Sequence, residues 1–310
     1  VPSGLEVRRV LGRSKITKKY DGCAPDFTPG TDIINRTLEL EKADVAMEWC
    51  VDDFENALAA VAGNNLAEEY LRSGVDSMDP QGTQVESWID QLVTDGVRRD
   101  FWRQMSFADS ASMDEDWNII DGIWPKLLSV DGSGSSYCVQ GIDTFPKEAT
   151  SDLADGQAIE VLKKVYQDSK NILKQYPQSR RYMMVTGTVY ENLLSSYEAN
   201  VNGTERQFTN LVSGQAGEDG QLPLFYRGIP IVPSYAWDTA LEDTTNPLYD
   251  QVRHLILYTT PDNQAIGLHD DVDASRLRGW FSNDDGVYRV RGQHRMGYTF
   301  IHCDLTTIAY

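Results

Sequence analysis

The stretch RRYMMVTGTVYENLLSSYE, residues 180–198, sets the frame for the rest of the sequence. Its first part is an apolar run that predicts a buried strand ending near Thr186, and TVYENLLSSYE predicts a helix that follows at once. Upstream, apolar side chains recur at helical spacing over residues 159–176. We expect Asp155 to cap that helix and Pro177 to end it. The sequence therefore predicts the order helix, strand, helix over residues 155–198.

A second apolar segment, LPLFYRGIPIVPSYAWD at 222–238, contains three prolines. A proline donates no backbone hydrogen bond, so a strand interrupted by Pro230 and Pro233 is expected at the edge of a sheet. Gly228 suits a tight turn just before that strand. An edge interrupted by prolines also resists accidental pairing with another strand.

Toward the N-terminus, residues 31–53 show period-two alternation. The alternation predicts two strands, and a turn at Lys42-Ala43-Asp44 would join them as a hairpin. A helix over 45–62 is the alternative, with the change from strand to helix near Asp52. The apolar alternate positions are Leu38, Leu40, Val45, Met47 and Trp49.

The other elements follow from similar patterns. VESWIDQLVTDGVRRDFWRQM, 85–105, predicts one long amphipathic helix that Gly96 weakens without ending. Residues 137–142 and 252–260 predict strands, Asn283–Gly286 predicts the turn of a hairpin, and a last strand is expected over 296–310.

Length and composition limit the class of protein. A chain of 310 residues with 41% hydrophobic content can bury a large core and is long enough for two lobes. No apolar run is long enough to span a membrane, and the start lacks the apolar core of a signal peptide. We therefore expect a soluble protein.

The charge of −19 is unevenly distributed along the chain. The segment 1–20 carries a balance of +5, so the rest carries −24. Two interpretations stay open: a flexible basic end on an acidic body, or an arm that docks on an acidic surface of nucleic acid or of a neighbouring copy. The basic residues of this end are Arg8, Arg9, Arg13, Lys15, Lys18 and Lys19.

Motifs for chemistry are weak throughout. The four cysteines are widely spaced, which favours a reduced, intracellular setting and indicates no zinc or redox motif. The four histidines form no metal-binding pattern, and neither the glycine-rich stretch at 132–134 nor the acidic stretch at 271–275 completes a phosphate or calcium loop. We predict no catalytic residue, cofactor or metal, and we do not expect an enzyme.

The order of the predicted elements resembles that of the major capsid proteins of tailed bacteriophages, whose fold is shared by bacterial encapsulins. The residues that carry the resemblance are Tyr182–Thr186, then Val189-Tyr190 with Leu193, then Tyr226–Val232 with Gly228 and Pro230, and RRDFWRQMSFADS at 98–110 after the long helix. These motifs are short, and the resemblance depends on their order over most of the chain.

The resemblance implies an α+β fold with named parts. Residues 1–32 would be an N-terminal arm, 33–51 an extended hairpin called the E-loop, 52–112 a peripheral domain with its spine helix at 84–105, 113–255 an axial domain, and 256–310 strands that return to the peripheral domain. The basic arm and the five apolar residues of the hairpin would then grip neighbouring copies.

The same resemblance implies a function without catalysis. The chain would assemble through pentamers and hexamers into the icosahedral head of a virion, built in the host cytoplasm around double-stranded DNA that it does not read by sequence. Portal, scaffold and decoration proteins would be its other partners, and no membrane would be involved. Two alternatives remain: an encapsulin-like cargo shell, which would contain enzyme instead of nucleic acid, and a soluble α/β hydrolase with paired carboxylates, which would be a small oligomer with a conventional pocket.

Overall fold

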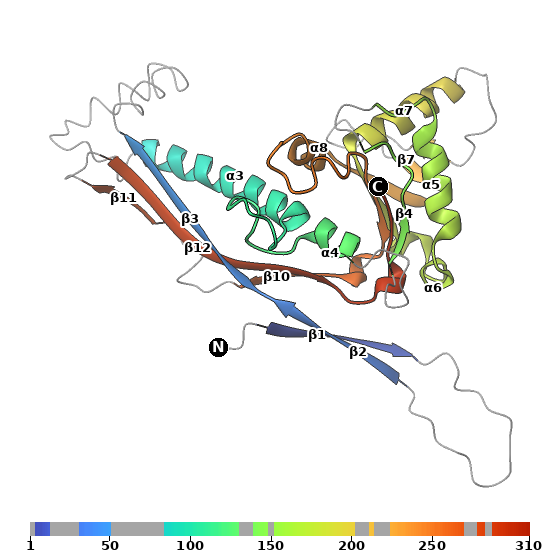
Figure 1. The fold of residues 1–310 in the computed structure, drawn as a ribbon, viewed down its shortest axis with the longest axis horizontal. Helices are drawn as coiled ribbons and strands as arrows, with labels where there is room; N and C mark the ends of the chain where they lie inside the picture. Colours follow the sequence, from blue (N-terminus) through green and yellow to red (C-terminus); the bar gives the residue numbers. More distant parts are fainter. Residues whose placement is uncertain are drawn as a thin grey trace, which may run out of the picture.

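The computed structural model of the chain describes residues 4–12, 31–50, 84–129, 139–147, 152–201, 211–213, 224–269, 278–282 and 287–310. Two sheets with their helices form the body, and a two-stranded ribbon extends from it (Figure 1). The first sheet has seven strands and the second is built on one long strand. This division into two lobes agrees with the expectation from chain length.

The seven-stranded sheet draws its strands from widely separated parts of the sequence. In spatial order they are β4 (Gln140–Ile142), β13 (Thr307–Ala309), β9 (Ile256–Thr259), β5 (Tyr182–Thr186), β8 (Ile229–Ser234), β7 (Leu224–Tyr226) and β6 (Leu211–Ser213). β5 has a parallel neighbour in β8 and an antiparallel neighbour in β9. The buried strand that the sequence predicts at 182–186 is confirmed.

Helices α5 (Gln157–Asp168) and α7 (Gly187–Val201) pack against this sheet, with the short α6 (Asn171–Lys174) and the 3-10 turn η1 (Gln178–Arg180) between them. The predicted helix after β5 is confirmed. Its first N–H groups, those of Gly187 and Thr188, donate to the carboxylate of Asp238, which satisfies donors that a helix start leaves open.

The predicted single helix over 155–176 is in fact two helices. α5 stops at Asp168 and Lys170 is extended before α6 begins. The residue at the N-terminal cap is Gly156, in the left-handed conformation with φ 75°, and not Asp155. The expected aspartate cap is wrong because the chain turns into α5 through a backbone conformation that favours glycine.

Strand β8 does not lie at the edge of its sheet, so that prediction is wrong. It lies between β5 and β7. The turn before it is confirmed: Arg227 and Gly228 have φ values of 50° and 77°, as a two-residue type I′ hairpin requires.

The prolines fit inside the sheet because their missing donors face no strand. Tyr226 and Ile229 flank the turn as the hydrogen-bonded pair, so N–H groups at odd positions of β8 point toward β7 and those at even positions toward β5. Pairing with β5 begins only at Ile231, after Pro230. β7 reaches only Leu224, opposite Ile231, so at Pro233 it has already ended.

The second sheet is built on β12 (Val287–Phe300). One side of β12 carries β3 (Glu41–Cys50), and β10 (Gln264–His269) and β11 (Arg278–Ser282) pair with its two halves. The pairing of β11 with β12 confirms the hairpin predicted around 283–286, whose turn lies outside the described residues. The predicted long helix is confirmed as α3 (Gln84–Phe107), which lies along this sheet with α4 (Ile123–Ser129) beyond its end (Figure 1).

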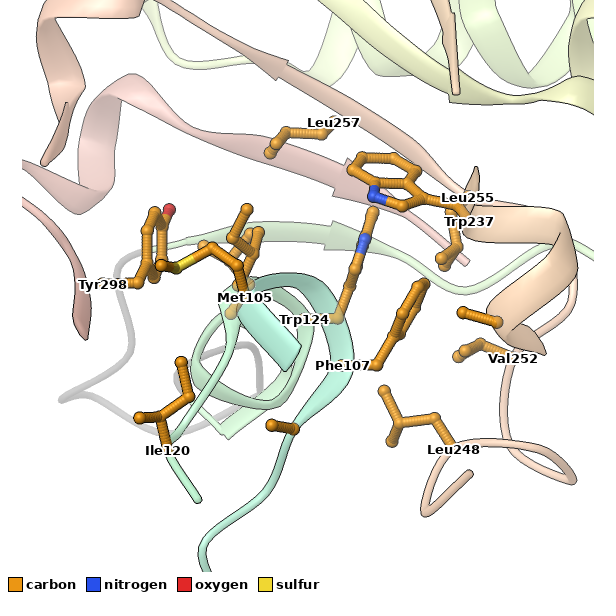
Figure 2. Close-up of a cluster of buried hydrophobic side chains, with 14 of the residues drawn as sticks. Met105, Phe107, Ile120, Trp124, Trp237, Leu248, Val252, Leu255, Leu257 and Tyr298 are labelled. Atoms are coloured by element: carbon orange, nitrogen blue, oxygen red, sulfur yellow. The ribbon is translucent and has the colours of Figure 1, made fainter. Parts of the chain in front are cut away.

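One hydrophobic core joins the two lobes (Figure 2). Trp124 of α4 meets Trp237 of α8 (Tyr235–Leu241) edge to face, with ring centroids 5.3 Å apart. Trp237 donates its Nε1–H to Ser106 of α3 at 3.0 Å. Since Met105, Phe107 and Tyr298 pack in the same cluster, α3 is fixed to both sheets.

The hairpin predicted within 33–51 is wrong. β2 (Thr31–Glu39) pairs with β1 (Gly4–Gly12) to form the ribbon, whereas β3 pairs with β12. The expected turn residues Lys42, Ala43 and Asp44 lie inside β3. The alternation predicts strands correctly, but it carries no information about the partner of each strand. The alternative helix is also wrong for residues 45–50, and its remainder lies outside the described residues.

The C-terminal part of the chain is divided between the sheets. β9 and β13 belong to the seven-stranded sheet, so residues 256–310 do not all return to the sheet that carries α3. The expected last strand over 296–310 is two strands, separated by the 3-10 turn η4 (Cys303–Leu305). A further 3-10 turn, η3 (Pro261–Asn263), links β9 to β10.

Cys303 is disulfide-bonded, which the wide cysteine spacing did not lead us to expect.

Candidate assembly surfaces

The ribbon β1–β2 is the part of the molecule best placed to reach another chain. Within the described residues each of its strands pairs only with the other. Arg8 and Arg9 lie in β1, opposite Asn35 and Ile34. The other predicted basic residues, Arg13, Lys15, Lys18 and Lys19, lie outside the described residues. Figure 1 shows the ribbon on the side of β12 opposite α3.

A pair of facing glycines holds the junction between the ribbon and the body. Gly267 of β10 and Gly297 of β12 are cross-strand partners. A Cβ on Gly267 would lie 2.5 Å from Leu38 and 2.6 Å from Leu40, and one on Gly297 would collide with the carbonyl oxygen of Glu39. The junction therefore fits closely into a gap that only glycines leave.

The contact of the ribbon with Gly267 and Gly297 involves two residues that were predicted to lie in an interface between copies. Leu38 is only 2% exposed in the single chain, so it has almost no area left to bury on assembly. That Leu38 contacts a neighbour stays a prediction, which its burial does not favour. Leu40 is half-buried against the same glycines. Both leucines were identified by alternation, which cannot distinguish a contact within the chain from one between chains.

The remaining apolar positions of the predicted hairpin lie on the face of β3 that points toward α3. Val45 is opposite Gly292 and Met47 is opposite Val290, which is buried. Met47 remains 38% exposed and Val45 is half-buried. Trp49 follows two residues later in β3, and its side chain lies outside the described residues. That Val45, Met47 and Trp49 contact a neighbour stays a prediction.

The opposite face of this sheet, which we call the outer face, is unusually basic for so acidic a protein. Cross-strand pairing places five cationic and two acidic residues on it. Arg291 contacts Asp44 at 3.1 Å and Arg289 contacts Glu48 at 3.4 Å. The hydrogen bond from Arg291 lowers the pKa of Asp44. The residues of the outer face are Lys42, Asp44, Glu48, Arg278, Arg289, Arg291 and Arg295.

Sequence reasoning missed the outer face because its residues come from β3, β11 and β12, which no local pattern places together. Trp280, 39% exposed, lies opposite Arg289 on it. Ile266 and Leu268 of β10, 43% and 61% exposed, add apolar area on the opposite face. Exposed apolar and charged groups together are typical of protein contact surfaces.

Lys126 of α4 forms a hydrogen bond with the backbone of β12. Its Nζ donates to the backbone oxygen of Tyr298 at 2.5 Å, and burial lowers its pKa. Burial also raises the pKa of Tyr298. The hydrogen bond stabilises the contact between α4 and β12.

The structure also bears on chemical sites. A groove of about 560 Å³ lies between α3 and α8 and is lined by Arg99, Trp102, Arg103, Ala236, Thr239 and Asp243, among others. None of its lining residues is serine, cysteine or histidine. In the described ranges no three His, Cys, Asp or Glu side chains gather as a metal site would need. No helix among the described residues is both long and apolar enough to cross a membrane.

Comparison with known proteins gives the fold. No protein-family model matches the sequence, and no curated protein matches it significantly. Solved structures do match. A chain of the satellite phage P4 procapsid that includes the size determination (Sid) protein aligns over 98% of this chain and 82% of its own, with TM-score 0.53 and 12% identity.

Two further structures agree. Gordonia phage Cozz aligns over 98% of this chain and 80% of its own, with TM-score 0.52 and 11% identity. The capsid of a native GTA particle aligns over 98% and 84%, with TM-score 0.50 and 12% identity. The chain has the α+β fold of tailed-phage major capsid proteins. The resemblance inferred from the order of elements is confirmed at the level of the fold.

Proposed function

We propose that this chain is a major capsid protein that assembles with itself, through pentamers and hexamers, into the icosahedral shell of a tailed-phage head enclosing double-stranded DNA. The observation that carries the proposal is the ribbon β1–β2, which leaves the body and pairs with no other described strand. Beyond its junction with the body at Leu38 and Glu39, such an arm is well placed to gain contact area against another copy. The likeness to chains of phage particles supports the proposal.

The two lobes provide a rigid tile for such a shell. The tryptophan core fixes α3 between both sheets, so contacts made at distant surfaces stay in a constant relation to one another. A closed shell needs one chain to make the same contacts around fivefold and sixfold positions. Under this proposal 1–32 stays the arm, 52–112 the spine-helix region and 113–255 the axial domain. The hairpin at 33–51 and the return of all of 256–310 are not kept, because β2, β9 and β13 pair elsewhere.

Charge supports the same arrangement. The basic N-terminal end and the outer face can meet acidic surfaces of neighbouring copies, because the remainder of the chain carries −24. Each exposed ion pair contributes little by itself, about 0–1 kcal/mol. Burial of exposed apolar side chains such as Met47, Ile266 and Leu268 adds about 1–2 kcal/mol each before ordering costs. Many repeats of such modest contacts stabilise a shell.

Negative-stain electron microscopy and sedimentation of purified material test the proposal. We expect hollow isometric particles of megadalton mass that hold nuclease-protected DNA when taken from infected or lysogenic cells. Particles that contain a protein cargo and no nucleic acid would favour the encapsulin-like alternative. A discrete monomer or dimer under every assembly condition would contradict both.

A further inference from the structure

Arg181, the residue before β5, is a buried cation with no anionic partner among the described residues. Its side chain is only 4% exposed. Nη1 donates to the hydroxyl of Tyr258 at 2.7 Å, and Nε is buried with no hydrogen-bond partner. Among the described residues no carboxylate forms an ion pair with it. Burying an unpaired charge is costly, so this arrangement needs an explanation.

Two further cations lie around the same group of rings. Tyr258 stacks on Tyr166 with centroids 6.5 Å apart, and Tyr226 meets Tyr166 edge to face at 5.9 Å. The guanidinium of Arg227 lies 4.8 Å from the centre of the Tyr166 ring, and Nζ of Lys174 lies 5.9 Å from it. We call Tyr166, Tyr226 and Tyr258 the tyrosine cluster.

The tyrosine cluster does not neutralise these cations. Burial raises the pKa of Tyr258 to about 12 and also raises that of Tyr226. Both hydroxyls are therefore protonated near neutral pH and remain uncharged. They can donate hydrogen bonds to an anion, but they supply no negative charge.

The backbone holds Arg227 in place at some cost. It is the one residue other than glycine with positive φ in the part of the chain that the structure describes. Side chains rarely adopt this conformation, which the type I′ turn before β8 requires here. The turn before β8 thus presents Arg227 toward the ring that Tyr258 and Lys174 also contact.

We propose that Arg181, Arg227 and Lys174 form a binding site for an oxyanion, a phosphate or a carboxylate group. Such a group would satisfy the open Nε–H of Arg181, and the cations of Arg227 and Lys174 beside the Tyr166 ring would attract it. Guanidinium groups bind oxyanions with strong, directional hydrogen bonds. The group has two possible sources: a free phosphate, or an acidic side chain of a second copy of this chain. The anion site itself goes beyond shell formation and can be tested on the unassembled chain, whereas a carboxylate from a second copy rests on the proposed function.

Thermal unfolding of the full chain in increasing inorganic phosphate, with NaCl keeping the ionic strength constant, tests the site. A ligand that binds only the folded state raises the melting temperature progressively. Arg181→Gln should weaken the apparent phosphate affinity by about tenfold or more, because a charged hydrogen-bonding partner is lost. Arg180→Gln is the matched control, since Arg180 is the exposed neighbour in η1 and should keep the full response.

A second variant keeps the test valid if Arg181→Gln does not fold. Arg227→Asn removes a cation while tolerating positive φ, and it should also reduce the response to phosphate. The same titration on unassembled and assembled protein separates the sources. A response in both states indicates a free anion, and a response lost on assembly indicates a carboxylate from a neighbouring copy. A wild-type response no larger than that of Arg181→Gln and Arg227→Asn would overturn the proposal.

Discussion

At Gly297 a single missing side chain decides where the ribbon leaves the body. A methyl group there would collide with the carbonyl of Glu39, and Gly267 opposite it is covered by Leu38 and Leu40. The neighbouring backbone cannot move away without breaking the pairing of β3 with β12, which begins at Glu41. The ribbon can lie where it does because neither Gly297 nor Gly267 has a Cβ atom.

We expect Gly297→Ala to destabilise the chain by about 1–3 kcal/mol, the usual cost of inserting a group into a closely packed place. Chemical denaturation would measure the change. Limited proteolysis should at the same time show faster cleavage between residues 31 and 50. If neither the stability nor the rate of cleavage changes, the close packing of Glu39 against Gly297 does not fix the ribbon to the body.

His294 predicts how stability depends on pH. It lies on the α3 side of β12 with Nε2 buried and without a partner, and desolvation lowers its pKa despite the opposing effect of Asp100. The folded state thus binds this proton less readily than the unfolded state. The contribution of His294 to the stability of the folded state is therefore complete above the ordinary histidine pKa of 6.5, and it is lost progressively as the pH falls below that value.

The melting temperature of the wild type should therefore fall more between pH 7.5 and pH 5.5 than that of His294→Gln. Scanning calorimetry at several pH values would measure this difference. Equal pH profiles for the two proteins would show that His294 does not control the transition.

At the scale of elements, α3 contains a glycine, Gly96, at a position where a larger side chain would fit without a clash. A Cβ on Gly96 would meet nothing within 4 Å. Gly96→Ala should stabilise the chain by about 0.5–1 kcal/mol, because glycine weakens a helix interior. Gly228→Ala should do the opposite, since Gly228 has φ 77° and an added Cβ would lie 2.9 Å from Gln178 Oε1. Urea denaturation of both variants would measure the contrast, and destabilisation by Gly96→Ala would contradict this account of α3.

The elements also show what the sequence can and cannot predict. α3, α7 and β5 were predictable because their patterns are local: an apolar stripe or a short apolar run bounded by polar residues. The partners of β2 and β3 were not, because alternation is identical for a strand in a hairpin and a strand paired with a segment near the other end of the chain. The strand that carries the prolines, β8, was misplaced for the same reason, since pairing geometry is not local. Arg181 gave no sign of burial in its sequence context.

At the scale of the whole molecule, we expect the ribbon to affect assembly and the body to determine the folding stability of the single chain. β1 pairs only with β2 among the described strands, and no described residue of 1–20 belongs to the core that joins the lobes, so deleting residues 1–20 should leave that core in place. We expect the melting temperature of the unassembled chain to stay nearly constant and the yield of shells to fall. Calorimetry and electron microscopy of the same preparation would measure both. Shells of normal yield and stability would refute the assembly role of the arm.

The order of strands in the large sheet also has a consequence for synthesis. β4 has β13 as its neighbour, and Tyr310 exchanges backbone hydrogen bonds with Ile142, Thr144 and Phe145. A ribosome that has just made β4 must translate more than half of the chain before it reaches Thr307, the first residue of β13. At ordinary elongation rates this takes roughly 10–30 s. A nascent chain cannot complete this sheet during that interval, so β4 gains its neighbour only after translation has passed residue 309.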